Sequence, residues 1–323
     1  MHQTKVEWGD RVWSPITGCK NDCLYCNSRR SSRRFASDVR MNLRNQDKYT
    51  FDGHVYVLNE IFKAPNGNTR STPFGFAPTY HRYSASRLET LKTPMSVLVS
   101  TNGEMFGPWV RDLYIKEIFD EVKKYPEQRF LFQTKFPERY MQLSENGILP
   151  DDNNCWYGWT VTDGELKDYQ FKAKHKYIVV EPLLGPIIGD LPEGVEWMIF
   201  GADTGKYSLR VTPQWEWIES IVKECRAKGI PVFMLDSIKD VIPEEQFTKD
   251  KPKAMTGIQY SKAKLAQYSD TCRCCGLKDF KRNMILLGAK TERGSYPTTV
   301  GFLCYECYKK MSKDYGLDDV SKQ

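Results

Sequence analysis

The chain has 323 residues, 40% of them hydrophobic and 13% aromatic, which is enough for one large domain and one small one. It contains no apolar run of about 18 residues, so no membrane span is expected, and its first residues lack the apolar core of a secretory signal. We therefore expect a cytoplasmic protein, in which ten cysteines are more typical of metal ligands or catalytic groups than of disulfides. The net charge of +6 is uneven, because residues 251–323 carry 14 Lys/Arg against 7 Asp/Glu. Such a basic tail suits a polyanionic partner, or simply aids solubility.

The first predicted strand is VWSPITG at residues 12–18, and a loop with Cys19, Cys23 and Cys26 follows it. This C-x3-C-x2-C spacing lets one flexible loop wrap a [4Fe–4S] cluster and leaves the fourth iron open. The amino and carboxylate groups of S-adenosylmethionine (SAM) suit that iron, and an electron from the cluster then cleaves SAM to a 5′-deoxyadenosyl radical. Tyr25 is expected to pack over the adenine side. The alternatives are incidental cysteines or an incomplete zinc site, although zinc loops usually bring paired C-x2-C arms.

Four arginines follow the loop at helical spacing: Arg29, Arg30, Arg33 and Arg34. Guanidinium groups on one helix face suit phosphate, and a solvated helix face is the alternative. Residues 51–90, rich in Gly, Pro and Tyr, are interpreted as an insertion that covers one end of a barrel.

The middle of the chain alternates short apolar runs with amphipathic stretches. The predicted strands cover residues 95–100, 129–133, 155–161, 176–180, 196–201 and 230–235. One helix is predicted within 110–124, with an apolar face of Val110, Leu113, Ile118 and Val122. A second is predicted within 213–229, where Pro213 opens the helix and Gly229 closes it. Its apolar face is Ile218, Ile221, Val222 and Cys225. This alternation indicates a parallel α/β barrel or a doubly wound sheet, whose chemistry lies at the carboxyl ends of the strands. The polar residues that fall there are Glu104, Lys135, Asp163, Glu181 and Asp203.

The strand–helix alternation stops near Asp250, which predicts a domain over 1–250 and a small module over 256–323. Four module cysteines form two C-x2-C arms that suit tetrahedral zinc, and Gly276 follows the first arm, where a knuckle needs positive φ: Cys272, Cys275, Cys304 and Cys307. The pattern is similar to treble-clef or zinc-ribbon modules; an auxiliary Fe–S cluster is the alternative, and Cys274 competes with Cys275 as a ligand. The basic residues expected to attract phosphates are Lys278, Lys281, Arg282, Lys290, Arg293, Lys309 and Lys310. Of the other thiols, Cys225 is predicted to lie in the core, and so is Cys155, for which a hydrogen-donor role is the alternative.

Six blocks in one order resemble the radical SAM superfamily, and more closely a phage-associated branch of largely unassigned activity. They are WSPITGC, STNGEMFG, FQTKFPERY, NCWYGWTVTD, VVEPLLGPI and WMIFGADTG, within about residues 8–240. The resemblance implies a partial (β/α)6 barrel with SAM laid across the strand ends, in the host cytoplasm if the protein is phage-encoded.

Carried over by position, the resemblance implies roles for seven residues after the strands. Asn102, Gly103 and Glu104 match the segment that holds the methionyl amino group, and Thr160 and Thr162 the region of the ribose or methionyl carboxylate. Glu181 and Asp203 are implied to face the ribose, adenine or substrate, and are counted with the three cysteines as candidate catalytic residues. The chain departs from the branch in its short first cysteine gap, in Gly201–Gly205 and in Leu235–Ser237, so the branch does not define the substrate.

We predict a radical SAM enzyme that modifies a nucleic acid base, with thymine hypermodification in DNA by radical rearrangement or C–C bond formation as the first hypothesis. Repair of a thymine lesion and RNA modification are alternatives, as is a radical SAM enzyme acting on a protein or small molecule. A regulator that binds nucleic acid and senses redox state through its cluster is the alternative from another class. The expected partners are nucleic acid, DNA first, and an external electron donor such as flavodoxin or ferredoxin; we expect a monomer with no membrane partner.

Overall fold

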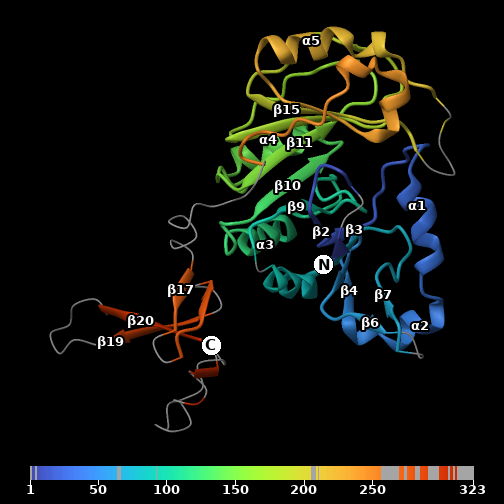
Figure 1. The fold of residues 1–323 in the computed structure, drawn as a ribbon. Coiled ribbons are helices and arrows are strands. Elements are labelled where there is room, and N and C mark those ends of the chain that lie inside the picture. Colours follow the sequence, from blue (N-terminus) through green and yellow to red (C-terminus); the bar gives the residue numbers. More distant parts are fainter. Residues whose placement is uncertain are drawn as a thin grey trace. The chain divides into compact units, whose positions relative to one another are not determined.

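The computed structural model describes residues 2–3, 6–63, 67–91, 93–204, 209, 211–255, 269–272, 275–280, 284–289, 298–304, 306–307 and 310. The chain divides into two compact units, Met1–Ile258 and Gln259–Gln323, and each is described by itself (Figure 1). In the part of the chain that is described, no helix has the length and apolar character needed to cross a membrane.

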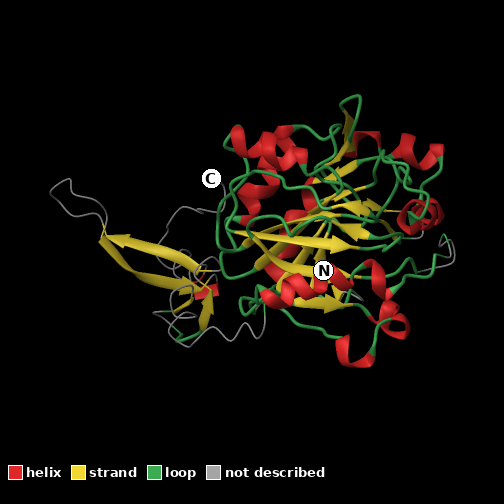
Figure 2. Ribbon diagram, turned by 90° about the horizontal axis from the view of Figure 1, so that it is seen from above, coloured by secondary structure: helices red, strands yellow, loops and turns green. Residues whose placement is uncertain are grey.

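An eight-stranded sheet forms the centre of the first unit. Its order is β1 (His2–Gln3), β2 (Arg11–Trp13), β9 (Ser96–Val99), β10 (Arg129–Thr134), β11 (Cys155–Thr160), β13 (His175–Val180), β15 (Val195–Phe200) and β16 (Val232–Met234). Only β1 is antiparallel to its neighbour; the other seven strands run parallel (Figure 2). Because the parallel strands lie in chain order, the sheet is wound in one direction and curls as a half-barrel rather than reversing as a doubly wound sheet does. The predicted parallel α/β architecture is confirmed, with seven parallel strands where the resemblance implied six.

The strands are buried on both faces, which explains their uninterrupted apolar runs. Alternate residues enter two separate cores. Phe130 and Phe132 of β10 pack on the helix side, whereas Leu131 packs on the inner side with Trp8, Trp156 and Trp197. Position along a strand therefore decides which side chains reach the interior of the curled sheet.

Helices cover only some of the crossovers between strands: α3 (Asp112–Val122), α4 (Glu138–Glu145) and α5 (Glu219–Ala227). The crossovers after β11 and β13, described throughout, contain the short paired strands β12 (Gly164–Glu165) and β14 (Ile187–Ile188) and no helix. Two details of the predicted helices were wrong. Leu113 is 57% exposed, because the buried face of α3 runs through Tyr114, Ile115, Ile118, Phe119 and Val122, and Pro213 precedes a 3₁₀ turn, Trp215–Trp217, rather than α5. Gly229 closes α5 with a φ of 68°, as predicted.

The predicted first strand was wrong as a single element. Pro15 cannot donate to a strand ladder, and the chain breaks there into β2 and β3 (Ile16–Thr17). β3 joins a second sheet ordered β3, β8 (Thr79–His81), β5 (Tyr56–Leu58) and β4 (Tyr49–Phe51). The segment interpreted as an insertion thus supplies a small sheet that holds the start of the three-cysteine loop.

The remaining elements of the first unit are short. They are the helices α1 (Asn27–Ser32) and α2 (Val39–Arg44), the hairpin of β6 (Phe62–Lys63) and β7 (Thr69–Arg70), and 3₁₀ turns at Arg33–Phe35, Gln46–Lys48, Arg82–Thr90, Asp236–Val241 and Glu244–Gln246. The second unit has two antiparallel pairs: β17 (Ser269–Thr271) with β18 (Lys278–Phe280), and β19 (Met284–Ala289) with β20 (Thr298–Cys304).

Candidate functional site

The three-cysteine loop is anchored to the carboxyl edge of the parallel sheet. Gly18 forms a parallel bridge with Gly103 of the turn after β9, and the Glu104 amide donates to the Gly18 carbonyl at 3.1 Å. The two chains approach so closely that a Cβ on Gly103 would lie 2.7 Å from the Thr17 Cα, which explains the glycine. On its other side the loop is held by the Cys19 amide, which donates to the Phe76 carbonyl at 3.0 Å.

Cys19, Cys23 and Cys26 are free thiols of intermediate exposure. The Asn21 amide lies 3.2 Å from the Cys19 sulfur, and the Arg29 amide lies 3.4 Å from the Cys26 sulfur, so both sulfurs accept backbone hydrogen bonds. Burial raises the pKa of the Cys19 thiol to about 12, so this thiol needs a bound cation to ionise near neutral pH.

The distances between the three sulfurs decide what they can hold. In the described part of the chain they are not all within 4.8 Å of one another, whereas ligands of one tetrahedral zinc ion lie about 3.8 Å apart. A cluster that presents a different iron to each sulfur keeps its ligands farther apart than a single ion does. The loop therefore fits a [4Fe–4S] cluster in donor type, number and backbone hydrogen bonding.

Arg29 holds this loop together instead of facing solvent. Its guanidinium donates to the carbonyls of Asn21, at 2.6 Å, and Cys19, at 3.4 Å, and pairs with the Asp22 carboxylate at 3.1 Å. It also lies 5.3 Å from the centre of the Phe76 ring. Arg30 donates to the Leu24 carbonyl, and Arg33 and Arg34 begin a 3₁₀ turn with exposed side chains. The four arginines therefore do not share one helix face, which corrects the predicted helix, and Arg29 contacts the loop itself.

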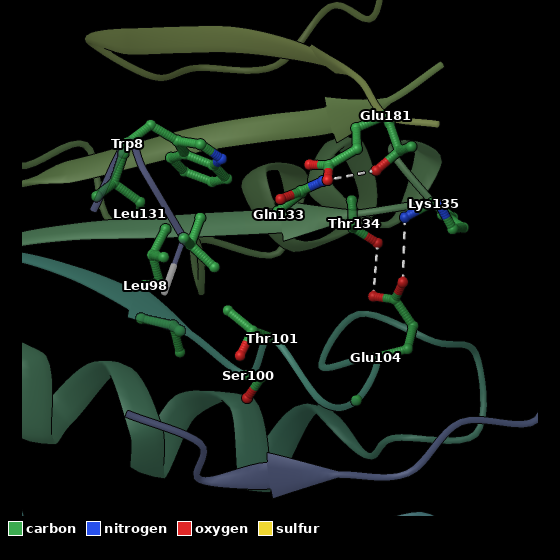
Figure 3. A pocket seen from close by; sticks show the side chains of 14 residues that line it. Trp8, Leu98, Ser100, Thr101, Glu104, Leu131, Gln133, Thr134, Lys135 and Glu181 are labelled. Atoms are coloured by element: carbon green, nitrogen blue, oxygen red, sulfur yellow. Dashed lines mark hydrogen bonds between the residues drawn. The ribbon is translucent and has the colours of Figure 1, made fainter. Parts of the chain in front are cut away.

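A cavity of about 260 Å³ opens at the carboxyl ends of the parallel strands, and we call it the strand-end cavity (Figure 3). Trp8, Leu98 and Leu131 form its apolar floor, which belongs to the inner core. Its polar wall contains Glu104, Lys135, Thr160 and Glu181, which the sequence analysis named, and also Gln133. The Gln133 amide donates to the Thr160 hydroxyl at 2.8 Å and fixes both side chains.

Glu104 is buried and fully engaged. Its carboxylate accepts from the Thr134 hydroxyl at 2.7 Å and the Lys135 amide at 3.1 Å (Figure 3). It also accepts from the Phe106 amide at 3.1 Å. Burial raises its pKa although these donors oppose the shift. This carboxylate therefore joins the turn after β9 to the end of β10, beside the cavity.

Lys135 is the cation of the site. Burial lowers its pKa, while the surrounding Cys23, Glu104, Cys19 and Cys26 act in the opposite direction, so the ammonium lies close to the loop thiols. Its nitrogen is 5.3 Å from the centre of the Tyr25 ring, and burial raises the pKa of that phenol beside Cys23. Tyr25 therefore lies between the loop and the cavity.

Glu181 faces the same cavity from the end of β13. Burial raises its pKa to about 7, and Lys135 opposes part of the shift. A buried carboxyl with a pKa near neutrality, beside a buried lysine, is the kind of perturbed pair that functional sites contain. Both signs of charge are thus available where the strands end.

Three other predicted residues lie outside the lining of the strand-end cavity. Asn102 accepts from the Ser28 hydroxyl at 3.3 Å, and the Thr162 hydroxyl donates to the adjacent Asp163 carboxylate at 2.8 Å. Asp203 accepts from the Leu209 amide at 2.5 Å, and its neighbour Thr204 accepts from the Asn27 side chain at 2.6 Å. The segment after β15 is therefore bonded to the helix that follows the cysteine loop.

Sequence reasoning placed Lys135 at the strand ends without giving it a role, and it missed Gln133 and Trp8 as site residues. Gln133 follows Leu131 by two residues on β10 and Lys135 follows it by four, just past the end of the strand, so the two-residue period of the strand was the available signal. Trp8 had no such signal, because it reaches the interior from the segment before β2.

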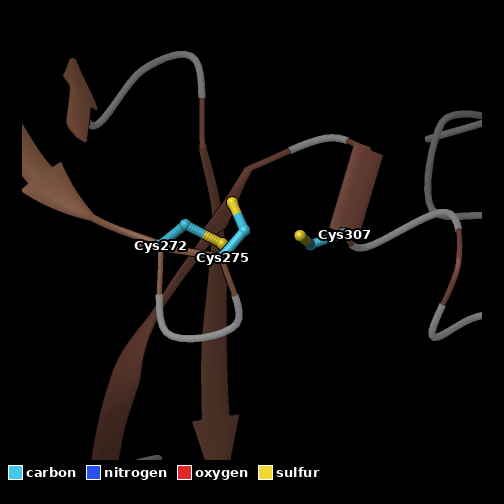
Figure 4. A group of neighbouring side chains, drawn as sticks. All are labelled: Cys272, Cys275 and Cys307. Carbon is cyan, nitrogen blue, oxygen red and sulfur yellow. The ribbon is translucent and has the colours of Figure 1, made fainter. Parts of the chain in front are cut away.

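A second group of thiols lies in the unit Gln259–Gln323. The sulfurs of Cys272, Cys275 and Cys307 are within 4.8 Å of one another (Figure 4). Gly276 has a φ of 75° and its amide donates to the Cys272 carbonyl at 3.0 Å, which is the predicted knuckle. Cys304 ends β20, and its side chain, like all of Cys274, lies outside the described residues. Three thiolates at this spacing fit a single tetrahedral ion.

The other predicted residues of this unit are only partly described. Lys310 is exposed and Lys278 begins β18, whereas Lys281, Arg282, Lys290, Arg293 and Lys309 lie outside the described residues. In the first unit Cys155 and Cys225 are both buried in the core on the helix side of the sheet, away from the inner face.

Comparison with known proteins gives one family and a distant structural likeness. A family model described as "Protein of unknown function (DUF5131)" matches residues 3–261. No curated protein matches. Two solved structures of spore photoproduct lyase variants, one with bound AdoMet and dinucleoside spore photoproduct, are similar at 9% and 10% identity, with TM-scores of 0.36 and 0.34; each match covers 97% of this chain and 73% of the other.

Proposed function

Since the chain belongs to the DUF5131 family, whose function is unknown, we propose its activity from the chemistry of its own residues. It is a radical SAM enzyme in which Cys19, Cys23 and Cys26 bind a [4Fe–4S] cluster and the strand-end cavity binds SAM. The observation that carries this proposal is that one loop brings three free thiols close to the buried Lys135, which lines that cavity. When bound, the cluster supplies the electron that cleaves the sulfonium of SAM at the iron without a protein ligand.

The residues of the cavity then bind and orient SAM. Lys135 is the cation available to the methionyl carboxylate, and Glu181 is the carboxyl available to the ribose hydroxyls or adenine. Glu104 acts through its bonds to Thr134 and Lys135, which fix the turn that carries Asn102 and Gly103 beside the amino group. The apolar floor of Trp8, Leu98 and Leu131 excludes water from the reacting end.

The proposed substrate is a nucleic acid base, with thymine in DNA as the first candidate. Arg33 and Arg34 are exposed directly after the cysteine loop, where guanidinium groups are available to backbone phosphates. A duplex base has to leave the stack to reach such a recessed site. The reaction proposed is hypermodification by radical rearrangement or C–C bond formation, with lesion repair and RNA modification as alternatives that the same experiment separates.

The second unit is proposed to bind zinc through Cys272, Cys275, Cys307 and Cys304, and to contact nucleic acid through its basic residues. The close spacing of the first three sulfurs supports a single ion rather than an auxiliary cluster. Truncation at residue 256 is expected to remove a zinc ion and the most salt-dependent part of DNA binding. Unchanged salt dependence after truncation would oppose a nucleic-acid role for this unit.

The test of the enzyme is anaerobic reconstitution with iron, sulfide, SAM and a reductant, followed by mass spectrometry of 5′-deoxyadenosine and of nucleosides from candidate DNAs and RNAs. We expect SAM cleavage, and a mass change confined to one base. Cleavage without any nucleic acid product would favour a protein or small-molecule substrate. A reduced cluster that never cleaves SAM would instead favour the redox-sensing regulator.

A further inference from the structure

A second and larger cavity, of about 700 Å³, adjoins the strand-end cavity, and we call it the side cavity. It lies among the ends of β2 and β9, the start of the cysteine loop, the segment after α1, and the small sheet of β3 and β8. Val6 and Thr101 line both cavities. Its volume is typical of sites for small molecules, and it adjoins the place where SAM is proposed to react.

A row of hydrogen-bonded side chains crosses the side cavity. The Thr17 hydroxyl lies 2.8 Å from His81 Nε2, and His81 Nδ1 lies 3.2 Å from the Tyr83 hydroxyl. The Arg87 guanidinium then lies 5.6 Å from the centre of the Tyr83 ring. His81 is only 3% exposed, and burial lowers its pKa to about 3, so the imidazole is neutral. The row joins Thr17, two residues before the first loop cysteine, to a half-buried cation.

The charge of the lining selects the kind of ligand. Among the described residues, eight Ser and Thr side chains line the cavity, Arg87 is its one charged group, and Arg87 has no carboxylate within ion-pair distance. The strand-end cavity, by contrast, has Lys135 with Glu104 and Glu181. A cavity of hydroxyls with one guanidinium favours a polar ligand that carries an anionic group, and disfavours a cationic or zwitterionic one.

An aromatic surface stands at the same cavity. Phe35 lines it and is 54% exposed, so its ring is accessible from the cavity. Asn102 and the Ser32 and Thr72 hydroxyls add donors and acceptors. An exposed ring, hydrogen-bonding groups and a guanidinium are together what a base and its phosphate require.

We propose that the side cavity binds the nucleotide unit that the enzyme modifies, with its phosphate on the Arg87 guanidinium and its base against Phe35. This inference rests on the proposed function only in taking a nucleic acid base as the substrate. It adds where the substrate binds: in the side cavity, across the Thr101–Glu104 turn from the proposed SAM site. It also adds what is recognised, namely a nucleotide with its phosphate.

Equilibrium binding to the full-length protein tests the inference without SAM turnover. The probes are thymidine 5′-monophosphate, thymidine, inorganic phosphate and a five-residue oligothymidylate. Because a charge-assisted hydrogen bond contributes about 1.5–3 kcal/mol, the monophosphate should bind about 10- to 100-fold more tightly than thymidine. Phosphate alone should compete weakly, and tighter binding of the oligonucleotide than of the monophosphate would identify the ligand as part of a strand.

Variants at the cation make the test specific. Arg87→Gln should reduce monophosphate affinity to that of thymidine, and Arg87→Lys should restore part of the difference. Arg44→Gln, at an exposed arginine in the last turn of α2 outside both cavities, is the matched control and should bind as wild type does. Thermal unfolding of each variant checks that the fold is retained.

Two results would overturn the inference. One is equal monophosphate affinity in wild type and Arg87→Gln; the other is competition by inorganic phosphate as strong as that by the monophosphate. If DNA is modified while either result holds, the proposed function stands and the position of the nucleotide is wrong. If Arg87-dependent binding occurs but SAM is never cleaved, the nucleotide site stands and the proposed enzyme does not.

Discussion

The two groups of cysteines in this chain use the same residue type at similar spacings, yet they differ in how closely their sulfurs lie. Cys272, Cys275 and Cys307 converge within 4.8 Å, from a knuckle and from the segment after a separate strand. Cys19, Cys23 and Cys26 come from one loop, and their three sulfurs are not all within 4.8 Å of one another. Converging arms suit one ion, and a single open loop suits a cluster that presents several irons. We infer that the backbone origin of the thiols, and not the C-x2-C motif alone, distinguishes the two proposed metal sites.

Removing one loop thiol is the most direct test of the difference proposed between the two cysteine groups. Cys23→Ala should abolish both the iron–sulfur absorbance and the cleavage of SAM, because two thiolates no longer hold the cluster. Cys225→Ala, which changes a core thiol on α5, is the matched control and should retain both. The iron content and 5′-deoxyadenosine yield of the two variants are measured after identical anaerobic reconstitution. Full cluster loading in Cys23→Ala would refute the assignment of the loop.

The opposite change tests the second group. Cys304→Ala should lower zinc from one ion per chain towards none and unfold the second unit, because a segment this small depends on its metal for stability. SAM cleavage should survive at least in part, since the loop thiols lie in the other unit. Metal analysis and limited proteolysis report the loss. Retention of zinc together with loss of the loop cluster would reverse the assignments of the two groups.

The two cysteine groups also differ in their surroundings, because the buried cation Lys135 lies close to the loop thiols. Lys135→Met should weaken SAM binding about 10- to 100-fold, because it removes one charge-assisted hydrogen bond to the methionyl carboxylate. Lys135→Arg should recover part of the affinity. Zinc content should be the same in both variants. Equilibrium SAM affinity is the measurement, and wild-type affinity in Lys135→Met would leave this buried cation with a purely structural role.

The strands of the curled sheet were predictable from the sequence because runs such as MSVLVS and KYIVV are buried on both faces and need no partner to be recognised. The break at Pro15 was readable from the proline itself, but the pairing of Ile16 and Thr17 with β8, more than 60 residues away, has no local signal. Leu113 was assigned to the buried face of α3, but that face begins at the next residue, Tyr114. Spacing alone does not fix the edge of an apolar helix face to within one residue. The side cavity has no local signal at all, since Thr17, His81 and Arg87 meet only through that distant pairing.

The smallest expected effect is a change in stability with pH at Glu181, which reports how dry the strand-end cavity is. Burial raises the pKa of Glu181 from 4.5 to about 7, so the folded chain binds more protons here than the unfolded chain between those values. Stability should therefore fall as pH rises through this range, by about 1 kcal/mol between pH 6 and pH 8 from this group alone.

Glu181→Gln should remove that dependence and stabilise the first unit at pH 8. Burial of His81 acts in the opposite direction, since its lowered pKa costs stability as pH falls below about 6.5, so the measurement is the difference between variant and wild type in chemical unfolding at each pH. A wild type and a Glu181→Gln variant that differ equally at pH 6 and pH 8 would mean that Glu181 titrates as a solvated carboxyl. The strand-end cavity would then be as wet as an exposed surface, and Glu181 would lose its role as a perturbed carboxyl of the proposed SAM site.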